Sequence, residues 1–183
     1  MRDRDPANLV TLFRTNFNGM PEFRNIFNLV LLRLPEETFE KLLTLTEDTL
    51  FLAHRGPYAS IQRIFVTPPI PKPLIIVQFP QSVTEEMGPL AQAGTIIHEL
   101  SHIILGHKPF AFFDRDEPEP EYQRPTVIVE GQGEKATDLR VVLGQTLSER
   151  EEGEANGLSK CLGFERELKE AFQFIERRKK KNV

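Results

Sequence analysis

Three residues, His98, Glu99 and His102, form the pattern His-Glu-x-x-His inside an apolar stretch, residues 93–107. In an α-helix, residues four positions apart lie roughly 40° apart around the axis and one turn apart along it, so both imidazoles face one point. Two imidazole nitrogens placed in this way are typical zinc ligands. Glu99 is offset by one residue, which suits it to act as the general base on a metal-activated water rather than as a ligand.

The helix that carries this motif is predicted to be buried on almost every side. Apolar residues cover the sides away from the motif, namely Ile96, Ile97, Leu100, Ile103 and Ile104. Burial of polar side chains without partners costs on the order of 1–3 kcal/mol each, so the motif needs a metal ion or a hydrogen-bond network. Core histidines bonded to backbone groups are the alternative interpretation. Three of the four histidines, His98, His102 and His107, lie within ten positions, which favours the metal.

A catalytic zinc ion usually has three protein ligands and keeps one position for water. His107, directly after Gly106 at the end of the apolar helix, is one candidate for the third ligand. In metzincins the third histidine lies ten residues after the first, whereas His107 lies nine residues after His98. The spacing does not match, and His107 is kept only as an alternative.

The acidic segment 149–159 is the other source of a third ligand. Glu152, Ala155, Asn156 and Ser159 share one helical face by their spacing, and small residues surround the carboxylate. Such a face can pack closely on the motif helix, bring Glu152 to the metal and let Asn156 hydrogen-bond a ligand histidine. Glu152 is therefore the favoured ligand, and Glu154 is a second alternative.

The patterns of apolar residues indicate an α+β fold in which a small sheet of about three strands packs on a helical bundle. Residues 1–50 are expected to be an N-terminal helical segment packed on a core of residues 51–183, with an exposed acidic, proline-rich loop at 114–125. Helices are predicted at 6–17, 23–31, 35–45, 89–105, 135–143, from 148 onward, and at 164–181. Strands are predicted at 50–53, 61–66, 74–79 and 126–130.

Composition excludes several classes of function. A net charge of −4 over 183 residues does not indicate a broad nucleic-acid surface. No apolar run approaches the length of a membrane span, and the charged start Met1–Pro6 lacks the apolar part of a signal peptide. Cys161 is the only cysteine, so no internal disulfide can form. We expect a soluble, cytoplasmic protein that binds neither nucleic acid nor membrane directly.

The motif His98-Glu99-x-x-His102, followed by Ile-Leu-Gly-His, preceded by a strand at 74–79 and followed later by Glu-x-Glu-Ala-Asn, resembles the ImmA/IrrE metallopeptidases, which are minimal gluzincins. The resemblance covers about residues 60–163. It implies a gluzincin core, a Zn²⁺ cofactor and peptidase activity, with a helix-turn-helix repressor as substrate. After Glu-Ala-Asn the family usually continues with an apolar stretch, whereas this chain has the sequence Gly-Leu-Ser-Lys-Cys-Leu.

Together these patterns predict a zinc-dependent endopeptidase that acts on a protein or peptide substrate. The alternative is a non-catalytic, zinc-containing binding or regulatory protein that retains the zincin fold and acts through protein contacts. A structural domain without a metal is the third interpretation. The sequence leaves the oligomeric state open.

Overall fold

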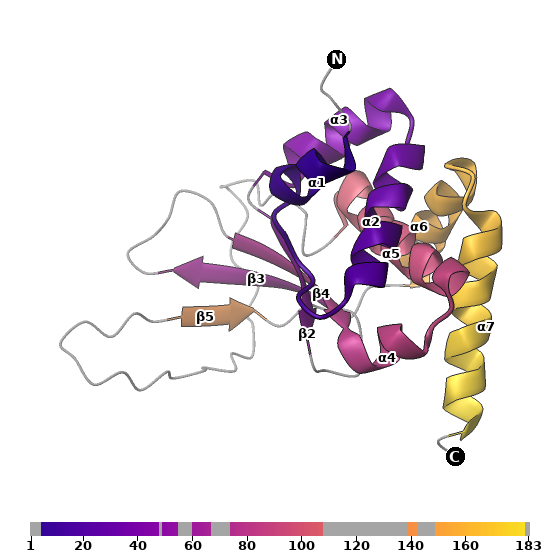
Figure 1. Cartoon of the computed structure of the whole chain (residues 1–183). Coiled ribbons are helices and arrows are strands. Elements are labelled where there is room, and N and C mark those ends of the chain that lie inside the picture. The colour runs from indigo at the N-terminus through magenta and orange to yellow at the C-terminus, as the bar shows by residue number, and fades with distance from the viewer. Residues whose placement is uncertain are drawn as a thin grey trace, which may run out of the picture.

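The computed structural model describes residues 5–47, 49–54, 60–66, 74–107, 139–142 and 149–181. Its helices are α1 (Pro6–Leu12), α2 (Pro21–Arg33), α3 (Glu36–Leu45), α4 (Gln81–Glu86), α5 (Pro89–Leu105), α6 (Glu149–Cys161) and α7 (Glu165–Lys181). Its strands are β1 (Thr15–Asn16), β2 (Thr49–His54), β3 (Ser60–Val66), β4 (Leu74–Pro80) and β5 (Leu139–Val142). The α+β prediction is confirmed, with a sheet on one side of a group of helices (Figure 1).

The sheet has the strand order β1-β2-β4-β3-β5. Strands β1, β2 and β4 are parallel, with Phe51 of β2 opposite Val77 of β4. Strand β3 runs antiparallel to both β4 and β5. The three predicted strands at 50–53, 61–66 and 74–79 are all present, and β1 and β5 extend the sheet at its two edges.

The two edge strands lie where the sequence predicted helix, so two predicted helices are partly wrong. Residues 139–142 form β5, paired with β3, so the helix predicted over 135–143 is wrong there. Short apolar runs fit either period, and pairing with a neighbouring strand decides between them. The helix predicted over 6–17 ends at Leu12, because Arg14 adopts a left-handed φ of 44° and turns the chain into β1.

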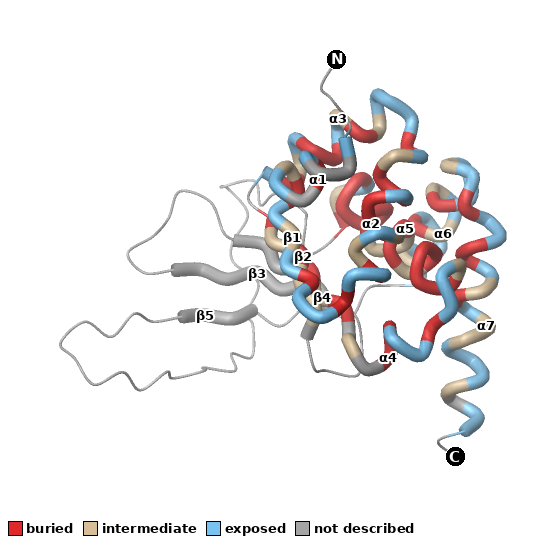
Figure 2. Tube along the Cα trace, viewed as in Figure 1, coloured by how far each residue is buried: buried red, intermediate tan, exposed pale blue. Residues whose placement is uncertain are grey.

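Phenylalanine rings form a prominent part of the core and meet in T-shaped or tilted pairs. Phe17 is one centre of this arrangement, with ring centroids 5.0 Å from Phe23 and 5.3 Å from Phe27. The same continuous cluster of buried residues takes in Ile96 and Leu100 of α5. Helices α2 and α3 thus pack against the helix that carries the motif, which is buried among them (Figure 2).

Helix α5 has well-defined ends and a close neighbour. It starts with Gly88 and Pro89 and ends at Gly106, whose left-handed φ of 72° caps the helix, as the sequence predicts. Helix α7 crosses it at Gly94, where a Cβ atom would lie 2.1 Å from the backbone oxygen of Glu167. This contact requires glycine, and it brings α7, and with it α6, against α5.

Several sequence predictions lie outside the described residues. They are the acidic loop at 114–125, the strand at 126–130 and the helix start at Ser148. Among the described residues, no helix is both long and apolar enough to cross a membrane.

Candidate metal centre

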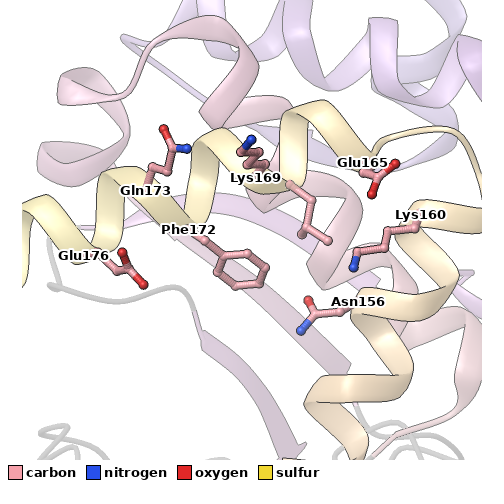
Figure 3. Close-up of a pocket in the computed structure, with 8 residues that line it drawn as sticks. Asn156, Lys160, Glu165, Lys169, Phe172, Gln173 and Glu176 are labelled. Atoms are coloured by element: carbon pink, nitrogen blue, oxygen red, sulfur yellow. The ribbon is translucent and has the colours of Figure 1, made fainter.

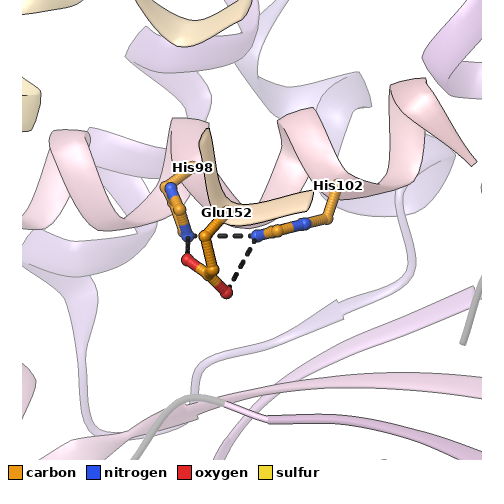
Figure 4. Close-up of side chains that lie close together, drawn as sticks. All are labelled: His98, His102 and Glu152. Atoms are coloured by element: carbon orange, nitrogen blue, oxygen red, sulfur yellow. Dashed lines mark hydrogen bonds and ion pairs between the residues drawn. The ribbon is translucent and has the colours of Figure 1, made fainter. Parts of the chain in front are cut away.

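Two histidines from α5 and one glutamate from α6 point toward a common place (Figure 4). The Nε2 atoms of His98 and His102 are 3.1 Å apart. The carboxylate of Glu152 lies 3.2 Å from His98 Nε2 through one oxygen and 3.7 Å from His102 Nε2 through the other. This group of His98, His102 and Glu152 could hold a metal ion.

These separations are compatible with a bound metal ion of the size of zinc. Ligand atoms about 2.0–2.2 Å from a tetrahedral zinc ion lie about 3.3–3.6 Å from one another. His98 Nε2 lies 3.1 Å from His102 Nε2 and 3.2 Å from a carboxylate oxygen of Glu152, and both distances are close to that range. Glu152 keeps 43% of its side chain exposed, so the centre is open on the carboxylate side.

Asn156 contacts the outer nitrogen of His98. Its Oδ1 atom lies 3.0 Å from His98 Nδ1, so the ring nitrogen donates and the amide oxygen accepts. In a neutral ring, a proton on Nδ1 leaves Nε2 of His98 unprotonated and facing the centre. The interaction that the sequence suggested for Asn156 is present in the structure, one helical turn after Glu152.

The face of α6 that the sequence singled out packs on α5. Ala155 and Ser159 are fully buried, and the Ser159 hydroxyl lies 3.0 Å from that of Ser101 on α5. Sequence reasoning missed Ser101, although it lies three residues after His98 and on an otherwise apolar helix, where a small polar side chain needs a partner. This buried contact fixes the distance between the histidine helix and the glutamate helix.

Glu99 lies next to this group but does not belong to it. Burial raises the pKa of its carboxyl above the usual range; the His98 ring acts to lower it and the Glu152 carboxylate to raise it. Both neighbours that influence Glu99 are members of the candidate centre. A carboxyl group in that position can accept and pass on a proton beside the metal ligands.

The second histidine is held in its neutral form. Burial, together with the neighbouring rings of His98 and His107, lowers the pKa of His102 to about 3. A neutral imidazole is the form that binds metals. His102 is therefore in the neutral form that binds a metal ion, and not in the charged form that would make an ion pair with a carboxylate.

The two alternative ligands, His107 and Glu154, do not join the group. His107 is buried, and its Nδ1 lies 2.9 Å from the outer nitrogen of His102. Its Nε2 contacts Glu154 Oε2 at 3.1 Å, and Arg150 donates to the other carboxylate oxygen at 2.7 Å. Hydrogen bonds from Arg150 and His107 hold the pKa of Glu154 below its usual range.

A cavity of about 310 Å³ lies beside the centre, between α6 and α7. Figure 3 shows Asn156 and Lys160 of α6 across from Phe172 of α7. The Phe172 ring, 41% exposed, also approaches the His98 ring, with 6.3 Å between centroids. Asn156 thus lines the cavity and also contacts His98 of the centre.

Comparison of the chain with models of protein families, with curated proteins and with solved structures finds no match.

Proposed function

We propose that the chain is a zinc-dependent endopeptidase in which His98, His102 and Glu152 bind the metal and Glu99 is the general base. One observation carries the proposal: three ligand atoms from two helices converge within metal-binding distance, directly beside the half-buried carboxyl group of Glu99. The resemblance to the ImmA/IrrE metallopeptidases suggests a protein substrate, and a helix-turn-helix repressor is the specific class we propose.

The ligand set fits a catalytic rather than a closed structural centre. Structural zinc sites usually have four protein ligands, mostly cysteine and histidine, whereas catalytic sites keep one position open. Two histidines and one glutamate supply three ligands, and the partly exposed side chain of Glu152 leaves access from solvent. When bound there, zinc would lower the pKa of water to about 7 and polarise a peptide carbonyl.

The protein's own residues would divide the remaining work. Asn156 holds the His98 ring so that its Nε2 faces the centre. The carboxylate of Glu99 would take a proton from the attacking water and later give it to the leaving amine. The desolvated surroundings of Glu99 raise its affinity for that proton, which favours the first half of this exchange.

The test separates zinc binding from hydrolysis. Glu99→Gln keeps the size of the side chain but cannot accept the proton, so the variant is expected to bind one zinc ion and to lose peptide cleavage. Hydrolysis is followed on a fluorogenic peptide library and on denatured casein, with zinc measured by elemental analysis. His98→Ala, which removes a ligand, serves as the metal-free control.

Two results would contradict the proposal. If Glu99→Gln cleaves peptides as fast as the parent, Glu99 is not the base. If the zinc-loaded parent cleaves nothing in the library, in casein or in a repressor panel, the chain is instead a metal-containing binding or regulatory protein.

A further inference from the structure

The outer nitrogens of both histidines in the centre lead to the same helix, α6. His98 reaches it directly, through Asn156. His102 reaches it through His107, which in turn contacts Glu154 two residues before Asn156. Helix α6 therefore supplies the carboxylate of the centre and also supports each imidazole from behind.

With both imidazoles neutral, the path from His102 to Glu154 admits one complementary arrangement of protons. A carboxylate can only accept, so His107 must carry its proton on Nε2, which faces Glu154 Oε2. The Nδ1 atom of His107 is then unprotonated and accepts from Nδ1 of His102. This leaves Nε2 of His102 unprotonated and directed at His98 and Glu152.

The opposite arrangement of protons is unfavourable at the Glu154 end of the path. If His107 donated from Nδ1 to His102, its unprotonated Nε2 would face the carboxylate of Glu154, with two acceptors about 3.1 Å apart. His102 would then carry its proton on Nε2, the atom that faces the metal position. The charge on Glu154, held in place by Arg150, thus disfavours the form of His102 that cannot bind a cation.

We propose that His107 and Glu154 are positioning residues that select the metal-binding tautomer of His102 from outside the centre. The inference rests on the proposed zinc site but not on peptidase activity. It also explains why a histidine and a glutamate that the sequence offers as ligands are paired with each other. A ligand histidine commonly donates its second nitrogen to such a partner, and loss of the partner costs about 10- to 100-fold in metal affinity.

The test uses three variants, each measured without any substrate. Glu154→Gln removes the charge, and its amide can either donate or accept, so the selection is lost while the contact can persist. His107→Phe keeps a ring in the buried position but breaks the path. Glu149→Gln removes the same charge from the first turn of α6 without a contact to either histidine, and is the matched control.

Zinc affinity is measured by competition with a chromophoric chelator, and the imidazole tautomers of the metal-free protein by two-bond ¹H–¹⁵N NMR. We expect Glu154→Gln and His107→Phe to weaken zinc binding by about 10- to 100-fold and Glu149→Gln to stay within about twofold of the parent. We expect the Nδ1-protonated fraction of His102 to be larger in the parent and in Glu149→Gln than in Glu154→Gln.

The possible failures are distinguishable. If the parent itself binds no zinc, the proposed function fails. If the parent binds zinc while Glu154→Gln matches Glu149→Gln in both affinity and His102 tautomer, the role of His107 and Glu154 is refuted and the zinc site stands. Circular dichroism checks that His107→Phe is folded, and Glu154→Gln carries the test if it is not.

Discussion

Replacing Gly94 by alanine tests whether the approach of α7 to α5 is as close as the structure shows. A Cβ at this position would lie 2.1 Å from the Glu167 oxygen and 2.9 Å from the Leu168 nitrogen, both backbone atoms of α7. Relief of that overlap requires α7 to move away by about 1 Å, a change of the overpacking kind that typically costs about 1–3 kcal/mol. Alanine recovers about 1 kcal/mol through its higher helix propensity.

The expected net effect is therefore a loss of up to about 2 kcal/mol in the free energy of unfolding. Gly157→Ala, on α6, is the matched control because a Cβ atom added there would meet nothing within 4 Å, and it should gain up to about 1 kcal/mol. Urea unfolding followed by circular dichroism, in chelator to exclude metal effects, measures both. If Gly94→Ala is as stable as Gly157→Ala, α5 and α7 do not meet as described.

Three further predictions concern the metal and the contact between α2 and α7. Free zinc at 100 times its dissociation constant should stabilise the parent by about 2.7 kcal/mol, measured as a rise in Tm that a chelator reverses, and His98→Ala should show no such rise. Asn156→Ala should weaken zinc binding by about tenfold in chelator competition, because it removes the acceptor for His98 Nδ1. Burial raises the pKa of the Glu167 carboxyl, but its hydrogen bond to Arg33 outweighs this and sets the pKa below the usual range, so its stabilisation is present above the unfolded pKa and lost as pH falls through the folded value. Glu167→Gln should then lose about 1 kcal/mol at pH 7 and approach the parent below about pH 4 in urea titrations, and an equal loss at both pH values would contradict this.

Local spacing was sufficient to predict the part of the centre that lies on a single helix. The separation of His98 and His102 places both rings on one side of α5 regardless of the rest of the fold. Glu152 and Asn156 could also be paired from their spacing, because residues one turn apart reach neighbouring atoms of the same partner helix. The boundaries of α5 followed from Gly88, Pro89 and Gly106, whose backbone preferences are strong.

Features that depend on contacts distant in sequence could not be predicted in the same way. The run at 139–142 suits a helix or a strand equally, and only β3 makes it a strand. His107 and Glu154 are 47 residues apart, so their spacing carries no sign that they meet. The close contact at Gly94 likewise depends on α7, which begins about 70 residues later.

The central claim is most directly tested by anomalous diffraction at the zinc edge from crystals of the zinc-loaded protein. We expect a single anomalous peak about 2.0–2.2 Å from His98 Nε2, His102 Nε2 and a carboxylate oxygen of Glu152. The claim would be contradicted if zinc-saturated protein showed its anomalous peak beside other residues, or showed no peak next to His98, His102 and Glu152.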